Sequence, residues 1–375
     1  MSNETTFDEM GLRENVLRGV YSYGFERPSL IQQKAILPFV NGKDLIAQSQ
    51  SGTGKTGTFV ISTLQRINVE EKTTQALILL PIRELATQVN TVIQGLGSHI
   101  QGLTTEVAIG GVRSSTSRHP AHIVIGTPGR VFDNLQHKHL NLDHLKVIVL
   151  DEADEMLSRG FIDQVHSIFQ YVPKTTQVAL FSATMSPEVI DISKKFMDEP
   201  LQILVKNEEL TLDGIRQFYV VVRNREEKYS VILDLFDVIS VTQSIIYANT
   251  KREVEQLYEK LTSNKFSVGL ITGNMAQDYR NEVMYEFRQG KTRVLLSTDM
   301  LARGIDIQQI SLVVNFDLPR EKETYIHRIG RSGRFGRKGV AINIITPDDI
   351  SFMKELEGYY STYVEELPSN IADLL

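Results

Sequence analysis

The stretch "LIAQSQSGTGKTGTF", residues 45–59, decides the fold of the first half of the chain. It starts with the apolar run Leu45–Ala47, turns at Gly52 and Gly54, and continues into a segment with helical character. A buried strand, a glycine-rich loop and a helix in immediate succession are the start of a βαβ unit. We therefore predict an α/β fold with parallel strands.

The same alternation of short apolar runs and amphipathic stretches continues on both sides of this unit. Such runs are typical of strands buried on both faces, with helices such as Arg83–Leu96 and Gly160–Tyr171 covering the sheet. The predicted strands are Leu45–Ala47, Ala76–Leu80, Ile123–Ile125, Val147–Leu150, Val178–Phe181 and Leu201–Val205, followed by Phe218–Val222, Ser244–Tyr247, Val268–Ile271, Arg293–Ser297, Leu312–Asn315 and Val340–Ile345.

The polar segment 206–214 interrupts the alternation, and a second series of strands follows it. A chain of 375 residues has the length of two ordinary domains. We therefore predict a first domain at 1–205, a short linker at 206–214 and a second domain at 215–375.

The composition limits the classes of protein to consider. The chain has no cysteine, which excludes disulfides and thiolate metal sites and fits a reducing compartment. Neither a secretory leader nor an apolar run long enough to span a membrane is evident, so we expect a cytoplasmic protein. The formal net charge of -6 counts weakly against a protein that coats nucleic acid, because such proteins are usually basic.

The loop Ser51–Thr56 has the pattern of a phosphate cradle. Its glycines let backbone amides and a helix N-terminus point at phosphate oxygens. Lys55 would reach the β- and γ-phosphates, and the Thr56 hydroxyl would bind Mg²⁺. The alternative is a flexible glycine-rich turn, and Ser49 occupies the slot of the pattern's first glycine.

A cluster of four carboxylates, Asp151, Glu152, Asp154 and Glu155, follows the apolar strand Val147–Leu150. Acidic residues at a helix N-terminus are stabilised by about 0.3–1 kcal/mol each, which explains one or two of them. A divalent ion and a triphosphate explain the rest. Asp151 would be the second Mg²⁺ contact and Glu152 would orient the attacking water, whereas Glu155 reads as a helix-start residue.

The run Asp151–Asp154 spells the motif of the DEAD-box RNA helicases, and the resemblance extends over nearly the whole chain. It implies two tandem RecA-like domains, each a parallel sheet flanked by helices, joined by a short flexible linker. It also implies RNA-stimulated hydrolysis of ATP to ADP and phosphate, with ATP and Mg²⁺ as cofactors.

The resemblance assigns roles to residues of the first domain. Gln32 would read the adenine, supported by Phe25, Arg27 and the upstream Phe7, while Gly52, Thr53 and Gly54 hold the phosphates. Asp154, Ser182 and Thr184 would couple ATP to strand separation. The RNA backbone would be contacted by Pro81, Arg83, Gly110, Gly111, Thr127, Pro128, Gly129 and Arg130.

In the second domain the resemblance makes Arg331 and Arg334 arginine fingers for the γ-phosphate. Asp306 would contact the ribose and Phe335 would lie near the adenine, while His327 would take part in coupling. By itself the basic run 327–337 could equally be a solvated face, a localisation signal or a nucleic-acid patch. Further RNA contacts are expected at Asn249, Gln277, Arg280 and Thr298.

Within the family, residues 151–161, 209–218 and 370–374 are most similar to eukaryotic translation initiation factor 4A and its nuclear relatives. Four positions depart from the family pattern. Ile82 stands in place of a threonine, Ser49 in place of an alanine, and Thr272 and Asn274 in place of the histidine and aspartate that flank a glycine.

The parts suggest a working mechanism. Shifting a two-state equilibrium from 1:99 to 99:1 takes about 5.5 kcal/mol, and a duplex step is worth about 1.4 kcal/mol. If the two domains close on ATP and RNA, one closure would thus disrupt a few base pairs. We therefore expect local, non-processive unwinding, with translation initiation as the process.

Two other functions fit the same motifs. One is an ATP-gated RNA clamp in a nuclear or nucleolar complex, and the other is a DNA translocase of the wider superfamily. For the RNA helicase and for the RNA clamp, we expect a monomer that a protein activator or scaffold directs to its RNA.

Overall fold

The computed structural model describes residues 6–49, 52–111, 120–157, 160–204, 215–238, 243–301, 310–330, 332 and 339–368. The chain forms two compact units, residues 1–205 and 206–375. The linker predicted at 206–214 lies outside the described residues.

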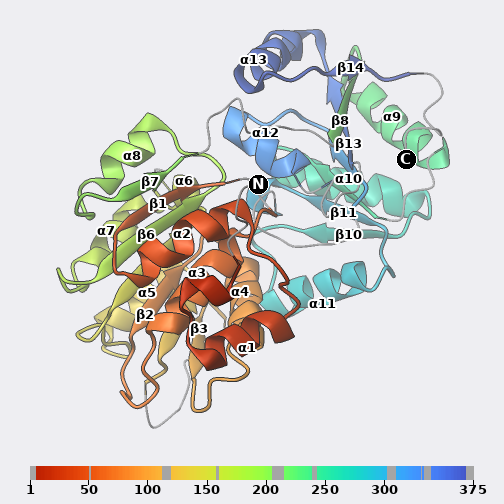
Figure 1. The fold of residues 1–375 in the computed structure, drawn as a ribbon. Coiled ribbons are helices and arrows are strands. Elements are labelled where there is room, and N and C mark those ends of the chain that lie inside the picture. Colours follow the sequence, from red (N-terminus) through yellow and green to blue (C-terminus); the bar gives the residue numbers. More distant parts are fainter. Residues whose placement is uncertain are drawn as a thin grey trace. The chain divides into compact units, whose positions relative to one another are not determined.

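The first unit is built around a seven-stranded parallel sheet with the order β3-β4-β2-β5-β6-β1-β7 (Figure 1). Its strands are β1 (Leu45–Gln48), β2 (Ala76–Leu79), β3 (Thr105–Ala108), β4 (Ile123–Gly126), β5 (Val147–Asp151), β6 (Gln177–Ser182) and β7 (Leu201–Ile203). Its helices are α1 (Glu14–Ser22), α2 (Leu30–Val40), α3 (Lys55–Arg66), α4 (Arg83–Leu96), α5 (Pro128–Gln136), α6 (Ala153–Met156), α7 (Ile162–Phe169) and α8 (Pro187–Ser193), after a 3₁₀ turn at Asp8–Met10.

Both faces of this sheet are covered, as the continuous apolar strands require. Successive residues of a strand point to opposite faces. Leu45 and Ala47 pack in the core under α1 to α4, while Ile46 packs in a second core under α5 to α8. The prediction of strands buried on both faces is confirmed for β1, β2, β4, β5 and β6.

The second unit has a seven-stranded parallel sheet with the order β10-β11-β9-β12-β13-β8-β14 (Figure 1). Its strands are β8 (Ile215–Val221), β9 (Ser244–Tyr247), β10 (Val268–Ile271), β11 (Val294–Ser297), β12 (Leu312–Asn315), β13 (Gly339–Ile345) and β14 (Glu365–Glu366). Its helices are α9 (Arg225–Val238), α10 (Lys251–Ser263), α11 (Gln277–Arg288), α12 (Lys322–Ile329) and α13 (Ile350–Tyr360), with 3₁₀ turns at Asp299–Leu301 and Pro347–Asp349. Two tandem α/β domains with parallel sheets are therefore confirmed.

Two strands were not predicted, and both lie at sheet edges. Strand β3 pairs only with β4, and three of its four residues are half-buried, so it shows no apolar run. Strand β14 consists of two exposed glutamates paired with Phe218 and Tyr219 of β8. Neither segment contains the apolar run by which a strand is predicted, unlike the edge strands β7 and β10, which were predicted.

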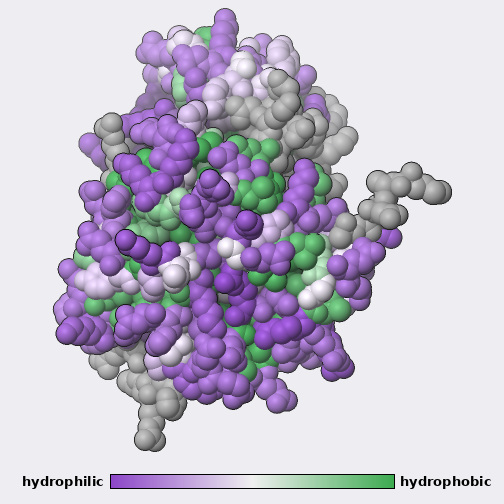
Figure 2. All heavy atoms as spheres, turned by 60° about the vertical axis from the view of Figure 1, so that its left-hand side comes forward, coloured by the Kyte–Doolittle hydropathy of each residue, from purple (hydrophilic) through white to green (hydrophobic). Residues whose placement is uncertain are grey.

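The face drawn in Figure 2 carries hydrophilic side chains over most of its area, with hydrophobic ones in separate patches. Large apolar side chains that are exposed include Leu30 in the first unit and Tyr285 and Tyr363 in the second. No helix in the described part of the chain is both long and apolar enough to cross a bilayer.

Candidate active site

Three predicted nucleotide segments of the first unit lie at one edge of its sheet. Strands β5, β6 and β1 are neighbours, with Asp151 opposite Phe181 and Gln48 opposite Ser182. The loops after these strands hold the acidic cluster, residues 182–184 and the phosphate cradle. Ligands of parallel α/β sheets bind at this carboxyl edge, so the fold gathers three segments that are distant in sequence at the place where a ligand is expected.

The phosphate cradle connects β1 to α3. Gly54 has a φ of 107°, which is strained for any residue with a Cβ, and α3 begins at the next residue. Lys55 is buried, and its Nζ donates a hydrogen bond to the carbonyl oxygen of Ser49. The hydroxyls of Ser49 and Thr53 hydrogen-bond to each other. Lys55 thus connects the first turn of α3 to the start of the loop, and the amides of this helix N-terminus would bind phosphate.

Two carboxylates stand at the end of β5. Asp151 is the last residue of the strand, and Glu152 follows with a left-handed backbone (φ 52°) that is uncommon for a residue with a Cβ. Both side chains are buried. Burial raises the pKa of Asp151, the charge of Glu152 raises it further, and Lys55 lowers it. Because two anions buried side by side are unfavourable, this pair is suited to a bound cation.

The side chain of Glu152 has one oxygen with no protein contact to explain it. Its Oε2 is buried and has no hydrogen-bond partner among the described residues. A buried polar atom without a partner costs free energy, so it points to a ligand or a water molecule. This matches the predicted task of orienting an attacking water.

Asp154 joins the acidic cluster to the end of β6. Its Oδ1 accepts a hydrogen bond from Ser182 Oγ (2.7 Å), and its Oδ2 accepts one from Thr184 Oγ1. Gln48 Nε2 at the end of β1 donates to the carbonyl oxygen of Ala183 (3.3 Å). The three predicted coupling residues of this unit are therefore in direct contact, and the segment they form is tied to the phosphate cradle.

The predicted adenine-reading residues lie beside the same loop. Gln32 is buried at the start of α2, where its Oε1 accepts the backbone N–H of Ser29 (2.8 Å) and its Nε2 points to the carbonyl oxygen of Gly54 (3.5 Å). Phe25 is half-buried and stacks on Phe7, with ring centroids 6.4 Å apart. Phe7 is fully buried, so it supports Phe25 from behind, whereas Arg27 is exposed.

The predicted RNA contacts of the first unit occupy the other half of the same edge. They follow β2, β3 and β4, which are neighbours in the sheet. The Arg83 guanidinium lies against Gly110, where an added Cβ would come within 2.6 Å of its Nη2. Gly129 is exposed near the start of α5, and Arg130 pairs with Asp133 (3.0 Å). Pro81, Gly111, Thr127 and Pro128 complete this group at the ends of the same strands.

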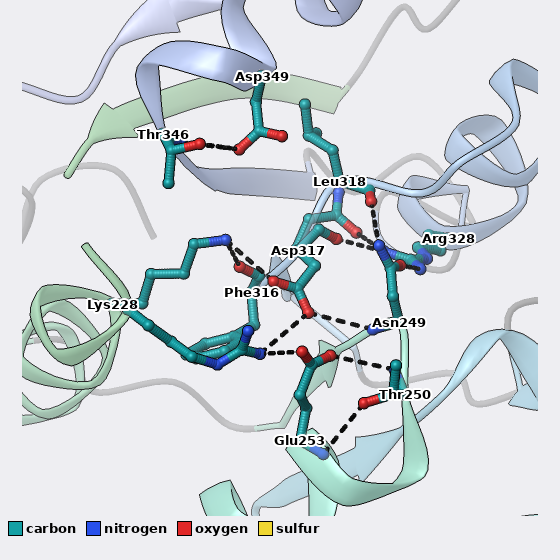
Figure 3. Close-up of polar contacts among 12 residues, drawn as sticks. Lys228, Asn249, Thr250, Glu253, Phe316, Asp317, Leu318, Arg328, Thr346 and Asp349 are labelled. Atoms are coloured by element: carbon teal, nitrogen blue, oxygen red, sulfur yellow. Dashed lines mark hydrogen bonds and ion pairs between the residues drawn. The ribbon is translucent and has the colours of Figure 1, made fainter. Parts of the chain in front are cut away.

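In the second unit, Asn249 follows β9 and Thr298 follows β11, its neighbour in the sheet. The Asn249 side chain is held internally, since its Nδ2 donates to the carbonyl oxygen of Leu318 (2.7 Å) and its Oδ1 accepts from Arg328 Nη2 (2.8 Å), as Figure 3 shows. Its backbone N–H donates to Asp317 (3.2 Å). Any RNA contact of Asn249 would therefore compete with bonds inside the unit.

The remaining predicted residues of the second unit are only partly accounted for. Arg280 in α11 and His327 in α12 are buried, and the side chain of Gln277 lies outside the described residues. Four predicted nucleotide contacts also lie outside them, namely Asp306, Arg331, Arg334 and Phe335. Their roles stay predictions.

Comparison with known proteins identifies the family. The profile of the DEAD/DEAH box helicase family matches residues 29–192, and the helicase conserved C-terminal domain matches residues 227–336. The chain is 56% identical over 372 residues to the ATP-dependent RNA helicase eIF4A of Saccharomyces cerevisiae strain YJM789, covering 98% of this chain and 94% of that protein. The chain belongs to the DEAD/DEAH box helicases.

Two further relatives of this helicase extend the comparison. It is 53% identical to the ATP-dependent RNA helicase eIF4A of Phaeosphaeria nodorum over 379 residues, covering 100% of this chain and 96% of that protein. Among solved structures, S. cerevisiae Dbp5 bound to RNA and ADP BeF3 has a TM-score of 0.92 at 37% identity, covering 96% of this chain and 95% of that one.

Sequence reasoning gave Arg328 of this helicase no role, although it belongs to the basic run 327–337. Its side chain is 0% exposed, and its guanidinium donates to Asn315 Oδ1 (3.2 Å), to the carbonyl oxygen of Asp317 (2.6 Å), to Asn249 and to Asp299. Its four partners come from the ends of β9, β11 and β12 and from the loops that follow. Figure 3 shows Arg328 beside two of these partners, Asn249 and Asp317. No periodicity in the sequence distinguishes this buried arginine from the other basic residues of the run.

Replacing Arg328 with methionine is expected to destabilise the second unit by about 3–5 kcal/mol, because several buried acceptors lose their donor at once. Scanning calorimetry or native-state hydrogen exchange would measure this loss. The matched control is Arg223→Met, since Arg223 is 90% exposed and pairs with Glu227 on the surface. Equal stability of the two variants would contradict the assignment of Arg328.

Replacing Gly54 with alanine is expected to weaken ATP binding by about tenfold or more, equivalent to ~1.4 kcal/mol. The added Cβ would lie 2.7 Å from Ser29 Oγ and 3.1 Å from Gln32 Nε2, so the adenine side of the site must shift. Gly102→Ala is the control, because Gly102 also has a positive φ (81°) but an open surrounding. Titration with a fluorescent ATP analogue would show unchanged affinity in the control and weaker affinity in Gly54→Ala.

Proposed function

We propose that this ATP-dependent RNA helicase unwinds short RNA duplexes locally and non-processively, in translation initiation. The observation that carries the proposal is the shared edge of the first sheet, where Lys55 follows β1 and Asp151 and Glu152 stand at the end of β5, the two strands that flank β6. A cradle for phosphate, a buried carboxylate pair and an unpartnered oxygen of Glu152 are the parts that ATP hydrolysis requires.

We infer that Mg²⁺ binds with ATP at Asp151 and Thr56. A carboxylate and a hydroxyl are oxygen donors of the kind that Mg²⁺ prefers, and the buried charge of Asp151 beside Glu152 fits a divalent cation. When bound, the ion would neutralise the charge of the phosphates. Chelation of Mg²⁺ should therefore abolish hydrolysis.

The protein's own groups would then act in order. The backbone of Gly52 to Gly54 and Lys55 bind the phosphates, and Glu152 Oε2 accepts a hydrogen bond from the attacking water. A change in the acidic cluster would be transmitted from Asp154 to Ser182 and Thr184, because both hydroxyls donate hydrogen bonds to the Asp154 carboxylate. The arginines at 331 and 334 belong to the second unit, so efficient hydrolysis would require both units.

RNA would bind through its backbone. Backbone amides at loop ends and at the α5 N-terminus, together with Arg83, suit phosphates and 2′-hydroxyls and do not read bases. Sequence independence leaves the choice of RNA to other proteins, so we propose that an activator or scaffold recruits a monomeric helicase in the cytoplasm.

A competition experiment would test the substrate. RNA and DNA of one sequence would be compared as stimulators of ATP hydrolysis, and duplexes of increasing length would be offered in single-turnover unwinding. We expect RNA to stimulate and unwinding to fail as the duplex lengthens. Stimulation by DNA alone would overturn the proposal, and minutes-long retention on RNA with hydrolysable ATP would favour an ATP-gated clamp.

A further inference from the structure

A row of polar side chains crosses the interior of the second unit. Ile342 and Val314 face the core under α9 and α10, so the next residue of each strand, Asn343 in β13 and Asn315 in β12, faces the opposite side. These two asparagines are in register with each other and with Tyr247 of β9. All three side chains are 0% exposed. Apolar contacts are the rule at such depth, so a polar row needs an explanation.

Helix α12 contacts this row of polar side chains through Tyr325 and Arg328. The Tyr325 hydroxyl donates to Gln217 Oε1 (2.9 Å) and accepts from Asn343 Nδ2 (3.1 Å). Asn343 Oδ1 accepts from Asn315 Nδ2 (2.8 Å), and Asn315 Oδ1 accepts from Arg328 Nη1 (3.2 Å). Two residues of α12, one turn apart, are thus joined through β13 and β12 by an unbroken chain of hydrogen bonds.

The chain continues at both ends. Gln217 Nε2 donates to Thr362 Oγ1 (2.7 Å) in the loop after α13. Arg328 donates to Asn249 and Asp299, at the ends of β9 and β11. The network therefore runs from β8 at one side of the sheet to the loops at the ends of β9 and β11, and α12 is its central member.

Such a network restricts the position of α12 more strictly than apolar packing would. An apolar interface tolerates small shifts, whereas a shift of this helix leaves buried donors and acceptors without partners. Helix α12 ends at Ile329, two residues before Arg331 and five before Arg334. The point from which the predicted arginine fingers start is thus held by hydrogen bonds.

We propose that Tyr325 and Asn343 are positioning residues for ATP hydrolysis, acting through α12 on the arginines that follow it. The inference rests on the proposed function, because it assumes that these arginines take part in the reaction. Neither side chain touches the nucleotide in this role. Misplacement of a catalytic group by about 1 Å can cost roughly 100-fold in rate, so small shifts of α12 matter.

The test uses the full chain with Tyr325→Phe, which keeps the ring and removes the hydroxyl. RNA-stimulated hydrolysis would be measured well below the melting temperature, with hydrogen exchange of residues 322–330. We expect kcat to fall by about 10- to 100-fold, KM for ATP and RNA to stay unchanged, and exchange in α12 to accelerate. Gln217→Leu removes only the acceptor of the Tyr325 hydroxyl and leaves the hydrogen bond between Asn343 and Tyr325 intact. This variant should therefore lower kcat by a smaller factor.

A control variant distinguishes an effect on the position of α12 from a general loss of stability of the second unit. Leu261→Val shortens a buried side chain of α10 in the core of the same unit, away from α12. If Leu261→Val loses about as much stability as Tyr325→Phe, its kcat should still be unchanged. An equal fall of kcat in Leu261→Val, or an unchanged kcat in Tyr325→Phe, would overturn the positioning role. Absence of RNA-stimulated hydrolysis in the unaltered chain would instead overturn the proposed function, and the positioning role with it.

Discussion

Glu152→Gln is expected to lower RNA-stimulated ATP hydrolysis by about 10²–10⁴-fold and to leave ATP binding nearly intact. The amide keeps the size and shape of the buried side chain but does not accept a proton. Lys55, Thr56 and Gln32, which would hold the phosphates, the metal ion and the adenine, are unchanged. Single-turnover hydrolysis and equilibrium binding of ATP, measured on one preparation, would show the two effects separately.

Glu155→Gln is the matched control for this substitution. Glu155 belongs to the same acidic cluster, is half-buried and lies in the short helix α6. It has no assigned role beyond the helix start, so turnover should be unchanged. If Glu152→Gln retained full turnover, or if both variants lost activity equally, Glu152 would not be the residue that orients the water.

Arg334→Ala is expected to lower turnover by about 10³–10⁵-fold, the contribution of an arginine finger to phosphoryl transfer. The positive guanidinium would stabilise negative charge that develops on the γ-phosphate. Alanine has no positive charge, so this stabilisation would be lost. Binding of ATP should persist, because the cradle and the adenine-reading residues belong to the first unit. Rapid-quench hydrolysis at saturating ATP and RNA would measure the loss.

Arg337→Ala is the matched control, since Arg337 lies in the same basic run and has no assigned contact. If the run acted only as a general nucleic-acid patch, both substitutions would weaken RNA binding to a similar degree and spare turnover at saturating RNA. That pattern would remove the arginine finger from the mechanism.

Much of the site was predictable because its motifs are local. The phosphate cradle at Ser51–Thr56 and the carboxylates Asp151 and Glu152 each come at the end of a strand with a clear apolar pattern, so their place at a strand end and a role in nucleotide binding could be predicted. The structure confirms those strand ends at β1 and β5. Strands β3 and β14 were not predicted because neither contains an apolar run.

Other features depend on which strands are neighbours, and the sequence contains no signal for this. The bonds of Asp154 to Ser182 and Thr184 exist because β5 lies beside β6. The full burial of Phe7 behind Phe25 and of Arg328 under the strand ends depends on contacts between distant segments. Hydrogen-bonding residues at such positions look like ordinary surface residues until the fold is known.

The sequence by itself therefore determined the fold class, the nucleotide chemistry and the family, because each is carried by residues close together along the chain. Tertiary structure alone decided that the loops with the predicted nucleotide contacts and the loops with the predicted RNA contacts lie along one edge of the first sheet, and that a polar row lies beneath α12. The physical reason is that strand order sets which loops and side chains meet, and buried polar groups find partners only through those meetings.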